Sequence, residues 1–266
     1  MPRIPRPPRP PRLPRLRLAP IRSKESVELD AARTRSGFEL PPFVRFDHFL
    51  DEWEWAQGEH ITIIGPTGSG KTRLARILLR RRQFVVVLGI KNRDSELYGP
   101  FEREGYQLVR SFDPEPGGDI ERVLFAPRTE LKGKEGRTYK SKRFRQVLHD
   151  VYDAGGWCVY ADDIQYMADQ LALATEFEEL WILGRSEGVS LVASSQEPVD
   201  IPVMAYGQAR HLFLFNNDDR RRADRMAELV GLNREVARDT ILRLPEHEFL
   251  YVNKNTKRML RSKVIQ

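Results

Sequence analysis

The sequence predicts an α/β domain built on a mostly parallel sheet with helices on both faces, preceded by a disordered tail. Short apolar runs rich in β-branched residues alternate with helical stretches over most of the chain, which is typical of a parallel sheet. A glycine-rich turn joins the first apolar run to the first helical stretch, whereas the start of the chain is rich in proline and arginine. We therefore expect a flexible tail over residues 1–36 and a single domain over residues 37–266.

The basic excess of the chain lies in this tail. The net charge is +6, but residues 1–24 hold eight basic residues and no acid, while the remaining 242 residues hold 36 basic and 38 acidic ones. Residues 2–16 repeat Pro-Arg-x five times, a pattern that excludes a helix and favours polyproline II. The repeat places its arginines along one edge, about 9 Å apart. This edge could bind a polyanion such as DNA or an acidic partner, or the tail could simply be solvated.

The elements of the domain follow one another in a regular order. Each apolar run predicts a buried strand, and each amphipathic stretch between two runs predicts a helix that returns the chain to the same end of the sheet. The predicted strands are His60–Ile64, Phe84–Leu88, Arg122–Phe125, Trp157–Ala161, Val189–Ala193, His211–Phe215 and Glu248–Val252. The predicted helices are Lys71–Arg82, Phe144–Asp153, Glu176–Leu183 and Arg220–Val230.

The composition narrows the class of protein. Hydrophobic residues make up 40% and charged residues 31% of the 266 positions, which excludes a wholly disordered chain. The longest nearly continuous apolar stretch, Phe84–Ile90, is far too short to span a bilayer, so we expect no transmembrane segment. Cys158 is the only cysteine, which excludes an intramolecular disulfide and suits a reducing compartment such as the cytoplasm. The five histidines show no metal-binding spacing and are interpreted as structural.

Residues 65–72 form a phosphate-binding loop. Their sequence fits the pattern G-x-x-x-x-G-K-[ST] in full, and the loop lies between a predicted strand and a predicted helix as the pattern requires. Its glycines let the backbone curl so that N–H groups and the helix N-terminus converge on phosphate oxygens. Lys71 is expected to reach the β- and γ-phosphates of ATP, and Thr72 to hold Mg²⁺. The expected nucleotide-binding residues are Gly65, Pro66, Thr67, Gly68, Ser69, Gly70, Lys71 and Thr72.

A pair of acidic residues follows the strand predicted at Trp157–Ala161. Asp162 is the natural second ligand of a nucleotide-bound Mg²⁺, with a water molecule between the two, because such ligands lie at the end of another strand of the same sheet. Asp163 is then placed to orient and polarise the attacking water as a general base. The alternative is an ordinary acidic turn between strand and loop, where aspartate is common.

Two polar features flank the strand predicted at Val189–Ala193. Gln196 follows its end, where an amide could contact the γ-phosphate or the attacking water. Arg185 precedes it, directly after a short helix that Thr175 and Glu178 are expected to begin with a capping box. An arginine exposed on a helix end could complete the site of a neighbouring subunit, or it could be a solvated surface charge.

Together these residues resemble the FtsK–HerA superfamily of P-loop ATPases, whose fold is RecA-like (ASCE). The resemblance runs from about Trp53 to Leu244 and includes the lead-in at residues 57–60, the phosphate loop, the Tyr160–Asp163 box and the block from Gly184 to Pro198. Among its members the chain looks most like the compact viral genome-packaging ATPases.

The resemblance implies a homo-oligomeric ring, a hexamer or a pentamer, that uses ATP and Mg²⁺ to translocate or package double-stranded DNA. It further implies that Arg185 is a finger in trans, that Gln196 is a sensor, and that a capsid or portal protein is a partner. The implied location is cytoplasmic, or virion-associated if the source is viral. Two positions depart from the family pattern: Asp163 stands where glutamate is usual, and Glu197 where arginine is frequent.

The DNA contacts are expected in a basic segment at residues 131–145, interpreted as a loop that leads into a helix. In a ring such a segment could face the pore and track phosphates, or it could be a solvated basic loop. Trp53 and Trp55 could flank an adenine base, or they could pack in the core. The candidate DNA contacts are Lys132, Lys134, Arg137, Lys140, Lys142, Arg143, Arg145 and the N-terminal tail.

Two other functions are compatible with the same sequence. One is a related motor for plasmid or conjugative DNA transfer, which would share every motif. The other is a slow nucleotide-gated switch or scaffold that recruits partners through the Pro-Arg tail, an alternative that the shortened Asp163 favours.

Overall fold

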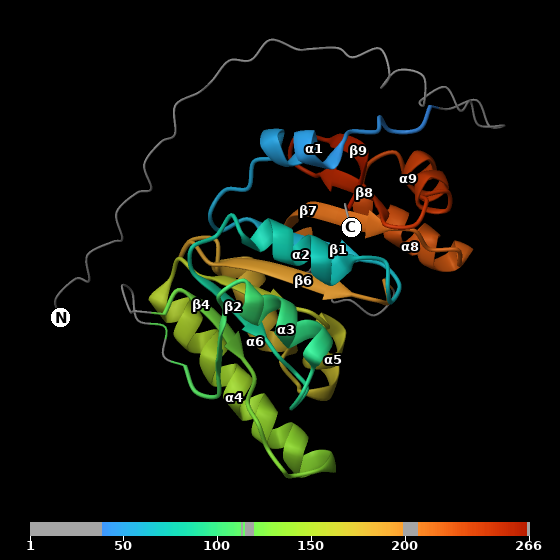
Figure 1. Cartoon of the computed structure of the whole chain (residues 1–266). Coiled ribbons are helices and arrows are strands. Elements are labelled where there is room, and N and C mark those ends of the chain that lie inside the picture. Colours follow the sequence, from blue (N-terminus) through green and yellow to red (C-terminus); the bar gives the residue numbers. More distant parts are fainter. Residues whose placement is uncertain (1–38, 113, 115–119, 199–206, 265–266) are drawn as a thin grey trace, which may run out of the picture.

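The fold is built on one mixed sheet, which has nine strands in the part of the chain that the structure describes, residues 39–112, 114, 120–198 and 207–264. In this computed structural model the strand order is β3-β4-β2-β5-β6-β1-β7-β8-β9 (Figure 1). The strands from β3 to β7 in this order are parallel to one another, and β8 is antiparallel to both of its neighbours, β7 and β9. The bounds are β1 His60–Ile64, β2 Val85–Leu88, β3 Gln107–Val109, β4 Arg122–Phe125, β5 Cys158–Ala161, β6 Ser190–Ser195, β7 Ala209–Phe215, β8 Glu248–Asn253 and β9 Arg258–Lys263.

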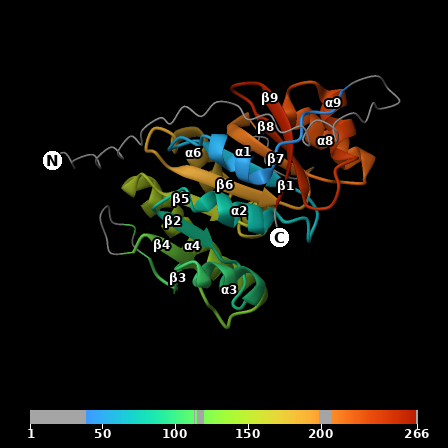
Figure 2. The same cartoon turned by 45° about the horizontal axis from the view of Figure 1, so that its top comes forward.

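Helices cover both faces of the sheet. The central strands β1, β2, β5 and β6 are buried along their whole length because both of their faces are covered, which explains their continuous apolar character. One apolar layer joins the sheet to α1 Phe46–Glu52, α2 Lys71–Leu79 and α3 Ser95–Arg103. The other joins it to α4 Gly133–Ala154, α5 Ile164–Gln170, α6 Ala174–Leu183, α8 Arg220–Val230 and α9 Arg234–Ile241. Figure 2 shows α8 and α9 side by side near the end of the sheet formed by β7, β8 and β9.

The predicted fold class is confirmed, and each predicted strand and helix is present with small shifts at its ends. The structure also has α1, α3, α5, α9, β3 and β9, which the sequence analysis did not predict. Among the predicted elements the largest difference is α4, which begins at Gly133 rather than near Phe144. Its buried residues, such as Val147 and Val151, lie mostly in the second half, so the apolar pattern marked only that half. The first half projects away from the sheet (Figure 1). Thus the interpretation of residues 131–145 as a loop was wrong for most of that segment.

The expected capping box of α6 was also wrong. The helix begins at Ala174 with Leu173 as its N-cap, and no side chain caps it. Thr175 therefore lies inside the helix, where its hydroxyl cannot act as a cap. The helix still ends at Leu183, and Gly184 follows as its C-cap in a right-handed conformation.

The parallel strands give the sheet two functionally different edges. The carboxyl edge is where β1, β5, β6 and β7 end, and the amino edge is where they begin. Because β6 lies between β5 and β1, the acidic pair, the polar segment after β6 and the phosphate loop follow one another along the carboxyl edge. Open α/β sheets bind ligands at the carboxyl ends of their strands, at the point where the order of the strands along the chain reverses.

The N-terminal tail and the absence of a transmembrane segment were both expected from the sequence. The tail over residues 1–36, and with it the boundary to the domain at residue 37, lies outside the described residues, so both stay predictions. Among the helices of the described residues, none combines the length and the apolar character that crossing a membrane requires.

Candidate functional site

The phosphate loop has the backbone that its glycines predict. Gly68 and Gly70 have φ angles of +79° and +104°, a left-handed conformation that other residues adopt at a cost. At Gly65 a Cβ atom would come within 2.6 Å of the Cβ of Phe215, so β1 and β7 could not both keep their positions with a larger residue. The loop ends at Gly70, and α2 begins at Lys71, so the N-terminus of α2 points at the space inside the loop.

Lys71 is buried and held over this loop. Its Nζ donates to the carbonyl oxygen of Pro66 at 2.8 Å, across the space that a phosphate would enter. Burial lowers the pKa of Lys71, and the negative charges of Asp162 and Asp163 partly oppose this shift. A desolvated ammonium with a carbonyl as its hydrogen-bond partner gains strongly from an arriving anion.

Thr72 and Asp162 lie together although they are 90 residues apart in sequence. The hydroxyl of Thr72 donates to Oδ1 of Asp162 at 2.9 Å, and the hydroxyl of Tyr160 donates to the same oxygen. Burial, together with the neighbouring Asp162 carboxylate, raises the pKa of Tyr160 well above its usual value, so the phenol remains a donor. A hydroxyl and a carboxylate oxygen are hard donors, which fit Mg²⁺ with water and phosphate as its further ligands.

Asp163 has a structural role that the sequence did not reveal. Its Oδ1 accepts a hydrogen bond from the backbone N–H of Tyr166 at 3.1 Å and caps α5. The other carboxylate oxygen makes no hydrogen bond with a described residue. A helix cap of this kind also occurs in ordinary acidic turns, so the role of Asp163 as a general base stays a prediction.

The polar segment after β6 contacts the phosphate loop. The amide oxygen of Gln196 accepts a hydrogen bond from the hydroxyl of Thr67 at 2.8 Å. The next residue, Glu197, forms an ion pair with Arg222 of α8 at 2.6 Å. Thus a basic side chain of α8 lies beside position 197, where the resemblance led us to expect an arginine. The sequence contained both charges but no signal that would pair them.

Arg185 does not lie near the phosphate loop of its own chain. It follows α6 at the amino edge, and it is exposed. Arg185 is near enough to His60, the first residue of β1, to help lower the pKa of that histidine, whose burial is the main cause of its fall to about 4. Ile182 and Leu183, directly before it, are 50% and 48% exposed. The structure therefore brings Lys71, Thr72, Asp162, Asp163 and Gln196 to one edge and Arg185 to the other.

The basic residues of residues 131–145 divide into two groups. Lys140 and Arg143 donate to the backbone carbonyls of Ile90 and Arg110, and Arg145 forms an ion pair with Glu176. These three are held against the body of the domain. The exposed residues with no ion pair or side-chain hydrogen bond to another described residue are Lys132, Lys134, Arg137 and Lys142.

The two tryptophans are not at the nucleotide site. Both precede β1 and therefore lie at the amino edge. Trp53 is buried and donates through Nε1 to the hydroxyl of Tyr251 at 3.1 Å. Trp55 packs under the guanidinium of Arg82 at 3.7 Å from the ring centroid. The possible contact with an adenine base was therefore wrong, and the core interpretation of Trp53 is confirmed.

His247 is a residue of the site that sequence reasoning missed. Its Nδ1 lies 3.2 Å from the carbonyl oxygen of Ser69, although 178 residues separate the two. His247 precedes β8, and because β8 runs antiparallel to β7, the start of β8 lies at the carboxyl edge. A histidine outside any motif gave no signal for this position in the sequence.

The fold matches solved nucleotide-binding proteins at low sequence identity. The DNA-packaging ATPase B204 of Sulfolobus Turreted Icosahedral Virus has a TM-score of 0.56 and 18% identity over 80% of this chain and 100% of that one. The genome packaging NTPase B204 of Sulfolobus turreted icosahedral virus 2, in complex with ATP-gammaS, has a TM-score of 0.56 and 14% identity, covering 78% and 98%. VirB4 of Thermoanaerobacter pseudethanolicus has a TM-score of 0.61 and 10% identity, covering 78% and 89%.

These similarities concern the fold, and they confirm the P-loop NTPase fold expected from the sequence. No protein-family model matches the chain, and no curated protein does.

Proposed function

We propose that this chain is an ATP-hydrolysing motor that acts as a homo-oligomeric ring and translocates or packages double-stranded DNA. The observation that carries the proposal is the joining of Thr72 to Asp162 beside a complete phosphate loop, with Gln196 bonded to the same loop. This arrangement supplies binding, charge stabilisation and a contact between the loop and a neighbouring strand, which are the parts that phosphoryl transfer needs.

The residues at the carboxyl edge divide the work of hydrolysis. The loop N–H groups and the N-terminus of α2 bind the phosphates, and Lys71 exchanges its carbonyl partner for phosphate oxygens. Bound Mg²⁺, held by Thr72 and through water by Asp162, would neutralise charge on the phosphates. Asp163 orients the attacking water through the carboxylate oxygen that does not cap α5. Gln196 reports the state of the γ-phosphate through its bond with Thr67.

Arg185 completes this site from a neighbouring subunit. Its exposure supports the proposal, and so does its place at the edge opposite its own loop, because in a head-to-tail ring one face of each subunit meets a different face of the next. The adjacent exposed Ile182 and Leu183 supply apolar surface for that contact. Hydrolysis then depends on assembly into a hexamer or a pentamer.

DNA is the proposed substrate of the motion. Lys132, Lys134 and Arg137, at the start of α4 and in its projecting half, form no ion pair or side-chain hydrogen bond with another described residue, and such side chains bind a phosphate backbone without reading its sequence. Genome packaging, with a capsid or portal protein as a partner, fits the similarity in fold to a DNA-packaging ATPase. Conjugative transfer remains the alternative, because the fold is equally similar to that of VirB4. On this proposal the motor acts in the cytoplasm or, if viral, with the virion.

One observation favours a second function, a slow nucleotide-gated switch. Asp163 is one methylene shorter than the usual glutamate and is already engaged as a helix cap. A carboxylate held in this way activates water less well. Such a protein would bind ATP, hydrolyse it slowly and act through its Pro-Arg tail.

Steady-state ATP hydrolysis with and without double-stranded DNA, over a range of protein concentrations, tests the proposal. We expect DNA to stimulate turnover and the rate to rise more steeply than protein concentration, because each site is shared between subunits. The Lys71→Ala variant is the control for contaminating activity. Slow turnover that is linear in protein and indifferent to DNA would contradict the motor and support the switch.

A further inference from the structure

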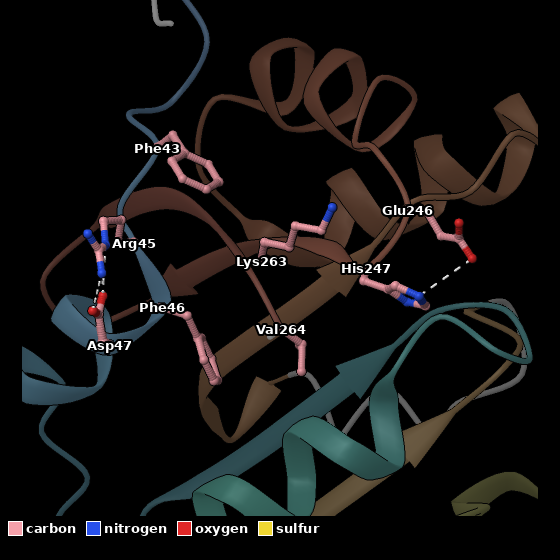
Figure 3. Close-up of a pocket in the computed structure, with 8 residues that line it drawn as sticks. All are labelled: Phe43, Arg45, Phe46, Asp47, Glu246, His247, Lys263 and Val264. Atoms are coloured by element: carbon pink, nitrogen blue, oxygen red, sulfur yellow. Dashed lines mark hydrogen bonds and ion pairs between the residues drawn. The ribbon is translucent and has the colours of Figure 1, made fainter. Parts of the chain in front are cut away.

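The phosphate loop has a cavity beside it that the proposed chemistry does not use. It has a volume of about 500 Å³ and lies between the start of α1, the end of β9 and the turn before β8 (Figure 3). Its lining combines three apolar side chains with five charged or polar ones, and its volume is within the range of small-molecule sites. The residues that line it are Phe43, Arg45, Phe46, Asp47, Glu246, His247, Lys263 and Val264.

We infer that this cavity binds the purine base and ribose of the nucleotide, and that His247 positions them relative to the phosphate loop. The inference rests on the proposed function, since it concerns the remaining part of the same ligand.

The direction in which a nucleotide must lie supports this assignment. The γ-phosphate end is marked by Asp162 after β5 and Gln196 after β6, which lie on one side of β1. The nucleoside therefore leaves the loop on the other side, toward β7, β8 and β9. The cavity lies on that side and on the face that α1 and α2 share, so it is open to a ligand that passes the N-terminus of α2.

His247 is the physical link between the loop and the cavity. Its Nδ1 lies 3.2 Å from the carbonyl oxygen of Ser69, and a Cβ built on Gly70 would lie 3.8 Å from the same nitrogen. Figure 3 shows its ring above the loop that joins β1 to α2, with most of the other lining residues to its left. The ring therefore contacts the last turn of the loop before Lys71 and also forms part of the cavity wall.

The backbone holds His247 in this position. Its φ is +64°, a left-handed conformation, and its carbonyl oxygen accepts a hydrogen bond from the N–H of Val264 at 3.0 Å. The end of β9 thus fixes the turn. A conformation that costs energy at a residue facing a ligand site is typical of a functional position.

The other side chains suit a flat aromatic ring with a ribose attached. Phe43 is 36% exposed at the cavity, so one ring is available for stacking, as is the imidazole of His247. Purines have the larger aromatic face and gain more from such stacking than pyrimidines do. Lys263 forms no ion pair with another described residue and adds an exposed cation near the path of the phosphates.

A smaller cavity of about 340 Å³ is the alternative position for the base. It shares Glu246 and His247 with the first cavity and is otherwise lined by residues 66–69 of the phosphate loop, Phe215, Asn216 and Leu244. Asn216 already donates one amide hydrogen to the carbonyl oxygen of Leu244 at 2.8 Å, and apart from the shared His247 this cavity has no exposed aromatic ring on which a base could stack. We therefore assign the base to the larger cavity.

Binding of ATP, CTP and inorganic tripolyphosphate to the full chain, measured by calorimetry with Mg²⁺ present, tests the inference. Tripolyphosphate has the phosphates of ATP but no nucleoside. The variants are Phe43→Ala, which removes one ring, and His247→Asn, which removes the other while keeping a residue that tolerates the left-handed conformation. Tyr139→Ala is the matched control because Tyr139 is an aromatic residue of similar exposure, 39%, on the distant α4.

We expect each variant to weaken ATP binding by up to about tenfold, the range of one aromatic stacking contact. Tripolyphosphate binding should stay within about twofold of wild type, and the preference for ATP over CTP should shrink. Tyr139→Ala should change none of these. Crosslinking with 8-azido-ATP should label the peptides that contain Phe43, His247 or Val264, which tests the position even if a variant fails to fold.

Four outcomes overturn the inference, and a fifth refutes the proposed function. ATP affinity that neither variant changes places the base elsewhere, as does crosslinking confined to the wall of the smaller cavity near Leu244. Equal losses for ATP and tripolyphosphate mean that the variants act through the loop. If the wild-type chain binds tripolyphosphate as tightly as ATP, it has a phosphate site but no nucleoside site. If it binds neither compound, the proposed function itself is refuted.

Discussion

Arg185 and Lys71 serve the same reaction only if they come from different subunits, and mixing two inactive variants tests this directly. Arg185 lies at the amino edge before β6, and Gln196 lies at the carboxyl edge after it. Six residues of strand at about 3.3 Å each separate the two ends by roughly 17–20 Å, which an arginine side chain cannot span. Each subunit should therefore fail to supply its own finger.

The expected magnitudes follow from this separation. An arginine finger raises turnover by a factor of about 10³–10⁵. The turnover of Arg185→Ala should therefore fall at least about 10³-fold, while its affinity for ATP is unchanged. Lys71→Ala should be inactive because it loses phosphate binding. In a ring assembled from equal amounts of both variants, about a quarter of the interfaces combine an intact loop with an intact arginine, because each interface takes one face from each neighbour.

The assay is ATP hydrolysis by co-refolded mixtures at a fixed total protein concentration. We expect near-zero rates for each variant alone and a maximum near a quarter of the wild-type rate at the equal mixture. Arg103→Ala, an exposed arginine at the end of α3, is the matched control and should retain full activity. A mixture as inactive as its components, or an Arg185→Ala variant with wild-type turnover, would refute the assignment in trans.

Three other measurements test separate parts of the argument. Asp163→Asn keeps a good N-cap for α5 but removes the charge, so turnover should fall about 10²–10⁴-fold with little change in thermal stability; a matching loss of both would assign Asp163 a structural role only. Charge reversal at Lys134 and Arg137 should weaken DNA-stimulated hydrolysis and make the salt dependence shallower by about one unit per residue, while hydrolysis without DNA is unchanged; equal loss in both conditions would argue against a DNA contact. Burial lowers the pKa of His211 to about 3 and that of His60 to about 4, so both are neutral in the fold, and the unfolded chain takes up their protons below about pH 6.5. The free energy of unfolding in urea should therefore be highest above pH 6.5 and fall by up to about 1.4 kcal/mol per histidine for each pH unit below it, and His211→Gln should flatten this slope; a variant with the wild-type slope would contradict the shift.

Local patterns in the sequence were sufficient for the central strands, for the helices that follow them most regularly and for the phosphate loop, but not for α1, α3, α5, α9, β3 and β9. The run His60–Ile64, the glycines after it and the helix that begins at Lys71 are all defined within about a dozen neighbouring residues, so their physical causes are local. The same holds for the acidic pair, since Asp162 and Asp163 follow a short buried strand. The projecting half of α4 was missed for the converse reason, because it buries few apolar side chains and so leaves no apolar period.

The order of the strands in the sheet determined which site residues that are far apart in the sequence lie close together. Placing β6 between β5 and β1 brings Asp162 to Thr72 and Gln196 to Thr67, contacts that span 90 and 129 residues of sequence. The antiparallel turn into β8 brings His247 to the phosphate loop, and α8 brings Arg222 to Glu197. Arg185, by contrast, is taken to the opposite edge. Residue spacing in the sequence does not predict these long-range contacts, because the order and direction of the strands depend on how the helices and the sheet bury their shared apolar surface.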